Sequence, residues 1–214
     1  MVDIRAFHGL RFDKAKTGSL DDVLTPPYDV IDEQERERLA SLSPYNMTHL
    51  ILPVPNAKLT AYEMAATLFH EWVEDGALCR DEKPYIYLLR QKFTGPDGNQ
   101  YMRKAFFAVM KLPEAGEQHI LGHERTFDKP MKDRLALMEK VQANVEPIFL
   151  MYSDADRRVT DQLFEPMEKE PPLLCAITPD QVEQKLWRVH CPDYLKRHIQ
   201  NQTLYIADGH HRFR

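Results

Sequence analysis

The chain has 214 residues, a formal net charge of −5 and a hydrophobic content of 43%, which allow one large domain or two small ones, each with its own core. The acidic balance argues against a protein built to hold duplex nucleic acid, whose phosphates require a basic surface. The three cysteines are widely spaced and fit neither a disulfide framework nor a Cys-x-x-Cys metal site. Since no apolar run reaches the ~18 to 20 residues of a membrane span and no signal-peptide core follows Met1, we expect a cytoplasmic protein without a membrane partner.

Apolar periodicity and turn residues predict an interleaved series of strands and helices. In chain order these are a strand over residues 6–12, a helix over 32–42, a strand over 47–52, a helix over 60–76, strands over 85–89 and 104–112, a helix over 131–143, a strand over 147–152, a helix over 160–168, a strand over 185–190, a helix over 194–200 and a strand over 203–207.

The turn-rich stretch over residues 94–99 joins two β-prone runs and predicts a long hairpin. In the helix over 131–143, Leu135, Met138 and Val141 have the spacing of core residues. Because a hairpin requires antiparallel pairing, the expected class is α+β (mixed α/β), with a mixed sheet and flanking helices.

The last predicted strand leads directly into Asp208-Gly209-His210-His211-Arg212. Asp208 is suited to cap a following helix, Gly209 lets backbone approach a ligand, and Arg212 with the first-turn amides would then face an anion. The histidines add groups that donate hydrogen bonds, move protons or bind a metal. The alternative is an ordinary Asp-Gly turn followed by a solvated helix start.

Two upstream stretches also carry reactive side chains. In Thr25-Pro26-Pro27-Tyr28-Asp29-Val30 the prolines fix an extended backbone that presents Tyr28 and Asp29. The stretch that begins His123-Glu124-Arg125-Thr126 places an acid, a base and a hydroxyl in a loop-like segment. It is not a His-Glu-x-x-His zinc helix, because residue 127 is Phe127. A solvated loop with a surface ion pair is the alternative.

These motifs together resemble an uncharacterised bacterial and archaeal family, a domain of unknown function with an Ala-Asp-Gly-His-His-Arg signature. The resemblance rests on Pro26-Pro27-Tyr28-Asp29-Val30, on His123-Glu124-x-Thr126 with Asp133-Arg134, on Asn144-x-x-Pro147 and on residues 206–212. Family members are about twice as long, so the resemblance implies that residues 1–214 are a single α+β region forming the N-terminal half of a longer protein, with a sub-boundary near 113–130. The C-terminal half of the same protein is then a partner.

The signature also resembles, more distantly, the Gly-x-His-Arg-type phosphate loop of the ParB and sulfiredoxin superfamily, which implies a ParB/sulfiredoxin-like element near the C-terminus. By that resemblance residues 209–212 grip nucleotide phosphates, with an acidic residue as base or Mg²⁺ ligand. The sulfiredoxin pattern has a cysteine where this chain has His210, which argues against sulfinic-acid repair. Family genes often lie beside serine-biosynthesis genes, which points to phosphoserine as a substrate.

Our leading hypothesis is therefore phosphoryl transfer or phosphate-ester hydrolysis on a small phosphorylated metabolite or nucleotide, with Mg²⁺ and a nucleotide as candidate cofactors. A non-catalytic module that senses a nucleotide or phosphometabolite is the alternative, and a metal-dependent hydrolase is the third hypothesis. The residues assigned to catalysis are Asp208, His210, His211, Glu124, His123 and Asp29, and those assigned to substrate or phosphate binding are Gly209, Arg212, Tyr28, Thr126, Arg134 and Asn144.

Overall fold

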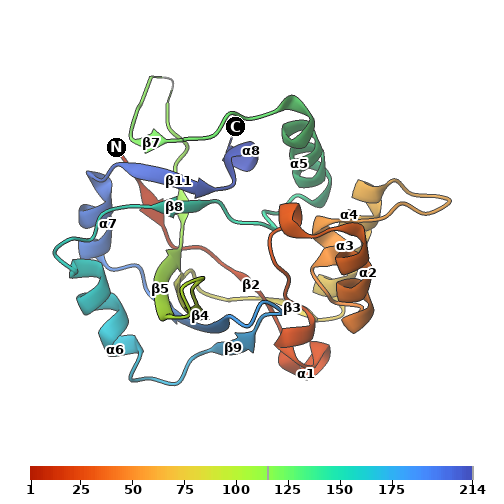
Figure 1. Ribbon diagram of the computed structural model, residues 1–214, viewed down its shortest axis with the longest axis horizontal. Coiled ribbons are helices and arrows are strands. Elements are labelled where there is room, and N and C mark those ends of the chain that lie inside the picture. The colour runs from red at the N-terminus through yellow and green to blue at the C-terminus, as the bar shows by residue number, and fades with distance from the viewer. Residues whose placement is uncertain (115, 214) are drawn as a thin grey trace. The chain divides into compact units, whose positions relative to one another are not determined.

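A computed structural model describes residues 1–114 and 116–213, and it is an α+β protein, as the sequence predicts. The described residues form two compact units, each built from several chain segments (Figure 1). Unit 1 comprises Met1–Gly9, Arg80–His123 and Leu150–Ile206, and unit 2 comprises Leu10–Cys79, Glu124–Phe149 and Ala207–Arg214.

Unit 1 is built mainly of strands. Its elements are β1 (Ile4–Arg5), β4 (Ile86–Thr94), β5 (Gln100–Phe107), β6 (Val109–Met110), β7 (Ile120–Leu121), most of β8 (Phe149–Met151), a π-helical turn η3 (Thr160–Phe164), α6 (Glu165–Met167), β9 (Leu174–Ile177), β10 (Glu183–Val189), α7 (Asp193–Gln200) and the first part of β11 (Leu204–Asp208).

An antiparallel sheet in the order β5-β4-β10-β9 forms the centre of unit 1. The expected long hairpin is its β4–β5 pair, in which Leu88 lies opposite Phe106. Leu88 also lies opposite Trp187 of β10, and both residues are buried in the core of the unit. A second sheet has the order β7-β11-β8, with β11 parallel to β7.

Unit 2 is mainly helical. Its elements are β2 (Leu10–Phe12), α1 (Lys14–Thr17), the 3-10 turns η1 (Leu20–Asp22) and η2 (Tyr28–Val30), α2 (Glu33–Leu42), α3 (Thr48–Ile51), α4 (Ala61–Glu74), β3 (Leu78–Arg80, whose last residue belongs to unit 1), α5 (Asp128–Val141) and α8 (His210–Phe213).

Local sequence explains where the long helices of unit 2 begin. Thr60 and Glu63 form a reciprocal capping box at the start of α4, and the Asp32 carboxylate accepts a hydrogen bond from the Glu35 amide at the start of α2. Helix α4 packs against α5, and buried Ala65 lies in one apolar cluster with Leu137 and Val141.

Two predictions about unit 2 are wrong. Residues 47–52 contain the helical turn α3 instead of a strand. The turn begins where the Asn46 carboxamide oxygen accepts hydrogen bonds from the amide and hydroxyl of Thr48, and a short apolar run does not by itself distinguish a strand from a helix.

The predicted core face of α5 is also wrong in part. Leu135 is 55% exposed and Met138 37% exposed, whereas Val141 is buried as expected. The buried face instead carries Leu137 and Arg134, because a polar cluster around Arg134 takes the place that an apolar side chain would otherwise fill. No helix among the described residues is long and apolar enough to cross a membrane.

Candidate functional site

The motif at the end of β11 folds into a tight turn followed by the short helix α8. Gly209 has a φ of 91°, a conformation that L residues with a side chain rarely adopt. Its carbonyl accepts hydrogen bonds from the Arg212 and Phe213 amides, so Gly209 stands at the start of the helix. The expected cap, Asp208, instead accepts a hydrogen bond from the Arg212 side chain at 2.7 Å.

Arg212 contributes the guanidinium group of this motif. Its side chain is 8% exposed. Besides Asp208, its Nη2 donates to the Pro147 carbonyl at 3.3 Å, and its Nη1 lies 3.9 Å from Glu146 Oε1. Its Cζ lies 5.9 Å from the centre of the Tyr28 ring. Residues from η2, from the segment after α5 and from the end of β11 therefore meet around one guanidinium.

Arg134 of α5 lies beside the same aromatic ring. Its Cζ is 4.2 Å from the ring centre of Tyr28, within the range of a cation–π contact. Its Nη1 donates to the Ile51 carbonyl at 2.8 Å and to Glu146 Oε2 at 3.2 Å, and its Nε donates to Asp133 Oδ2 at 2.9 Å. Glu146 thus lies between two guanidiniums, and we call Tyr28, Arg134, Glu146 and Arg212 the double-arginine cluster.

Glu146 is the carboxylic acid of the double-arginine cluster. Burial raises its pKa above the ordinary value, although Arg212 and Arg134 act in the opposite direction. A carboxyl group that takes up a proton more readily than usual is thus placed among groups suited to anions.

This raised pKa predicts a particular pH dependence of stability. Between pH 4.5, the ordinary pKa of the group, and its higher pKa in the fold, the folded chain holds a proton that the unfolded chain has released. The free energy of unfolding therefore falls as the pH rises through this window. In Glu146→Gln this contribution is absent. Urea unfolding of both proteins from pH 4.5 to about pH 7 is expected to show the wild type losing stability relative to the variant, and a constant difference would contradict the shift.

His210 of α8 is buried, and its Nδ1 lies 3.3 Å from Glu124 Oε2. This contact joins two motifs that the sequence analysis assigned to catalysis. A carboxylate beside one ring nitrogen restricts the orientation of an imidazole. The neighbouring His211 ring lies 6.4 Å from that of Phe127, and its Nδ1 is buried without a hydrogen-bond partner among the described residues.

The other assigned residues are exposed or half-buried. Asp29 is exposed on η2, where its charge raises the pKa of the neighbouring Tyr28, an effect smaller than that of burial. Thr126 is half-buried. Asn144 is exposed and lines a cavity of about 10 Å³ together with Arg134, Glu146 and Arg212. His123 is exposed at the end of a segment of unit 1.

Sequence reasoning missed Glu146, Asp133 as a partner of Arg134, and Tyr62. The Tyr62 hydroxyl donates to Asp133 Oδ1 at 2.6 Å, which raises the pKa of Tyr62. Burial raises the pKa of Asp133, but hydrogen bonds from Tyr62 and Arg134 outweigh it and leave that pKa lowered.

A continuous series of polar contacts therefore runs from Tyr62 through the double-arginine cluster to Asp208. The signal for Glu146 was its place inside Asn144-x-x-Pro147, a quoted motif whose carboxylate was not singled out.

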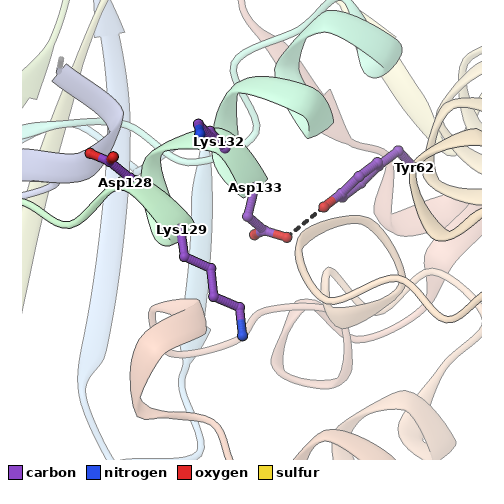
Figure 2. Close-up of a pocket in the computed structure, with 5 residues that line it drawn as sticks. All are labelled: Tyr62, Asp128, Lys129, Lys132 and Asp133. Atoms are coloured by element: carbon purple, nitrogen blue, oxygen red, sulfur yellow. Dashed lines mark hydrogen bonds between the residues drawn. The ribbon is translucent and has the colours of Figure 1, made fainter.

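An open pocket of about 440 Å³ lies at the other end of this series, where Tyr62 of α4 faces the first turns of α5 (Figure 2). Figure 2 shows the Tyr62 hydroxyl directed at Asp133, with Lys129 and Lys132 on the same end of α5. The pocket is lined by Tyr62, Asp128, Lys129, Lys132 and Asp133. Among the described residues, no group of three or more His, Cys, Asp or Glu side chains is arranged to hold a metal ion.

The chain matches a known protein family. A family model described as "Protein of unknown function (DUF1015)" matches residues 4–214. No curated protein matches the chain significantly. No solved structure does so either.

Proposed function

The chain belongs to the DUF1015 family, and we propose that it handles phosphate, by phosphoryl transfer or phosphate-ester hydrolysis on a small metabolite, at residues 208–212. The observation that carries this proposal is the nearly buried Arg212 at a glycine turn, held beside a second buried arginine on the same tyrosine ring. The planar guanidinium fork matches phosphate oxygens better than any other side chain.

Arg134 and Arg212 would have different roles in this reaction. Arg134 is held by Ile51, Asp133 and Glu146, so it fixes the position of Glu146 and of the Tyr28 ring. Arg212, with the amides that follow Gly209, would stabilise the charge on the phosphoryl oxygens, and such stabilisation commonly lowers the barrier of these reactions more than any other effect. Resemblance of residues 206–212 to the ParB and sulfiredoxin phosphate loop supports the same assignment.

His210 with Glu124 would supply the proton transfer. In hydrolysis, a water oxygen bonds to phosphorus while the ester P–O bond breaks, and a proton passes from the water to the leaving oxygen. His210, oriented through its Nδ1 by Glu124, would take up the proton that the attacking water loses or donate the proton that the leaving oxygen gains. In transfer, the hydroxyl of an acceptor molecule takes the place of the water.

A non-catalytic sensor of a nucleotide or phosphometabolite is the second candidate. The observation that favours it is the closed state of the cluster, in which Arg212 is already paired with Asp208 and the adjoining cavity measures only about 10 Å³. A site of this kind has to rearrange to admit a phosphate, and a rearrangement can itself be the output of a sensor.

Assays on the full-length protein separate these candidates. ATP, CTP, serine and phosphoserine are offered singly and in pairs with Mg²⁺ present and absent, and both binding and product are measured. An enzyme releases product, and His210→Gln is expected to lower that rate by about 100-fold or more. Binding without product supports the sensor. If no phosphorylated compound binds, both candidates fail.

A further inference from the structure

In this structure the Arg212 fork, meaning the N–H groups of its planar guanidinium, cannot bind a phosphate with two hydrogen bonds. A guanidinium has five N–H donors in a fixed plane. Both hydrogens of Nη2 have an acceptor: Asp208 Oδ2 lies at 2.7 Å and the Pro147 carbonyl at 3.3 Å. Nη1 faces Glu146 Oε1 at 3.9 Å. Nε is buried and has no hydrogen-bond partner among the described residues.

Nη2, the occupied nitrogen, is required for any bidentate binding of an oxyanion. An oxyanion binds a guanidinium with two parallel hydrogen bonds either end-on, through Nη1 and Nη2, or side-on, through Nε and Nη2. Both arrangements use Nη2. The free Nε can therefore join a two-pronged grip only when one acceptor of Nη2 has been replaced.

Of the two acceptors of Nη2, Asp208 is the one that can be displaced. Its side chain is 41% exposed, whereas that of Arg212 is 8% exposed. The other acceptor of Nη2 is the Pro147 backbone carbonyl, and the guanidinium is also fixed by Glu146 and Tyr28. Rotation of Asp208 into water would vacate one position on Nη2 without moving Arg212.

Gly209 keeps the guanidinium within reach of Asp208. A Cβ atom at position 209 would lie 2.9 Å from Arg212 Nη2 and 3.2 Å from Nε. The guanidinium therefore folds back onto the glycine backbone, next to the residue that closes its fork. A side chain at position 209 would push the guanidinium away from this position, and the φ of 91° also disfavours any residue other than glycine.

We propose that Asp208 gates the phosphate site: its carboxylate occupies the Arg212 fork in the unliganded chain and is exchanged for an oxyanion of the ligand. This inference rests on the proposed phosphate-handling function and adds its regulation. Asp208 is a positioning residue, because it acts on the ligand through Arg212.

The test is the affinity for inorganic phosphate, measured by isothermal titration calorimetry on the full-length protein. Asp208→Asn keeps the shape of the side chain but removes its charge, so the competing charge-assisted hydrogen bond is weakened. We expect Asp208→Asn to bind phosphate about fivefold to tenfold more tightly than the wild type. Asp208→Glu keeps a competing carboxylate and is expected to restore the wild-type affinity.

Glu139→Gln is the matched control, because it removes one exposed negative charge from α5 outside the cluster and is expected to leave phosphate affinity unchanged. Thermal unfolding verifies that each variant is folded, and Asp208→Ser replaces Asp208→Asn if the latter is not. If Asp208→Asn, or Asp208→Ser in its place, binds phosphate as tightly as the wild type or more weakly, the gate is wrong but the phosphate site is not contradicted. Equal tightening by Glu139→Gln also overturns the gate. If neither the wild type nor the position-208 variants bind phosphate, the proposed function fails and the gate with it.

Discussion

Replacing Arg134 by methionine is expected to lower the free energy of unfolding by about 3–5 kcal/mol, measured by urea denaturation at neutral pH. The Arg134 side chain is 5% exposed and pairs with both Asp133 and Glu146. Methionine fills much of the same volume, but it removes the hydrogen bonds to the Ile51 carbonyl and to Glu146, which among the described residues keeps only the Tyr28 amide at 3.4 Å and Arg212 at 3.9 Å. The loss of one partner from a buried ion-pair network is what makes the effect large.

Lys140→Met is the control for this experiment. Lys140 lies on the same helix, and its ammonium group is 3.5 Å from Glu63 in an ion pair whose two side chains are 54% and 39% exposed. Exposed pairs contribute about 0–1 kcal/mol, so this variant should unfold almost as the wild type does. A loss in Arg134→Met as small as that in Lys140→Met would contradict a large contribution of the buried Arg134 pairs to stability.

Replacing Arg212 by lysine is expected to weaken phosphate binding by about 10- to 100-fold, since hydrogen bonds to charged groups contribute about 1.5–3 kcal/mol. Lysine retains the positive charge near Asp208 and Glu146 but lacks the planar fork. The loss should appear in the calorimetric dissociation constant, and the far-ultraviolet circular dichroism spectrum should remain that of the wild type.

Lys132→Gln separates this result from a general effect of charge. Lys132 lines the open pocket beside Tyr62, and its removal changes the net charge of the chain, which Arg212→Lys does not. We expect Lys132→Gln to bind phosphate as the wild type does. A large loss in Lys132→Gln together with unchanged binding in Arg212→Lys would move the phosphate site to the pocket.

The local structure of the 204–213 segment could be predicted because its signals are local. A β-prone run predicted β11, and a glycine after an acidic residue predicted a turn before a helix. The partner of Asp208 could not be predicted in this way. A carboxylate before a short helix can accept a hydrogen bond either from the helix amides or from a side chain one turn later. The contacts of Arg212 with Pro147 and Glu146 hold its guanidinium where Asp208 accepts from it.

The position of Arg134 shows a second limit of sequence reasoning. Periodicity alone places Leu135 and Met138 on the buried face of α5, yet both are partly exposed. A buried arginine is stable only where carboxylates and carbonyls from distant segments surround it, and those partners come from Ile51 and Glu146. Such convergence of distant residues leaves no pattern within the helix itself.

The most direct measurement is a crystal structure of the chain grown with inorganic phosphate. We expect a phosphate bound at residues 208–212, with oxygens on Nε and Nη2 of Arg212 and the Asp208 carboxylate turned away into solvent. Phosphate bound at Lys129 and Lys132 instead, with the 2.7 Å contact between Asp208 and Arg212 intact, would contradict both the site and its gate.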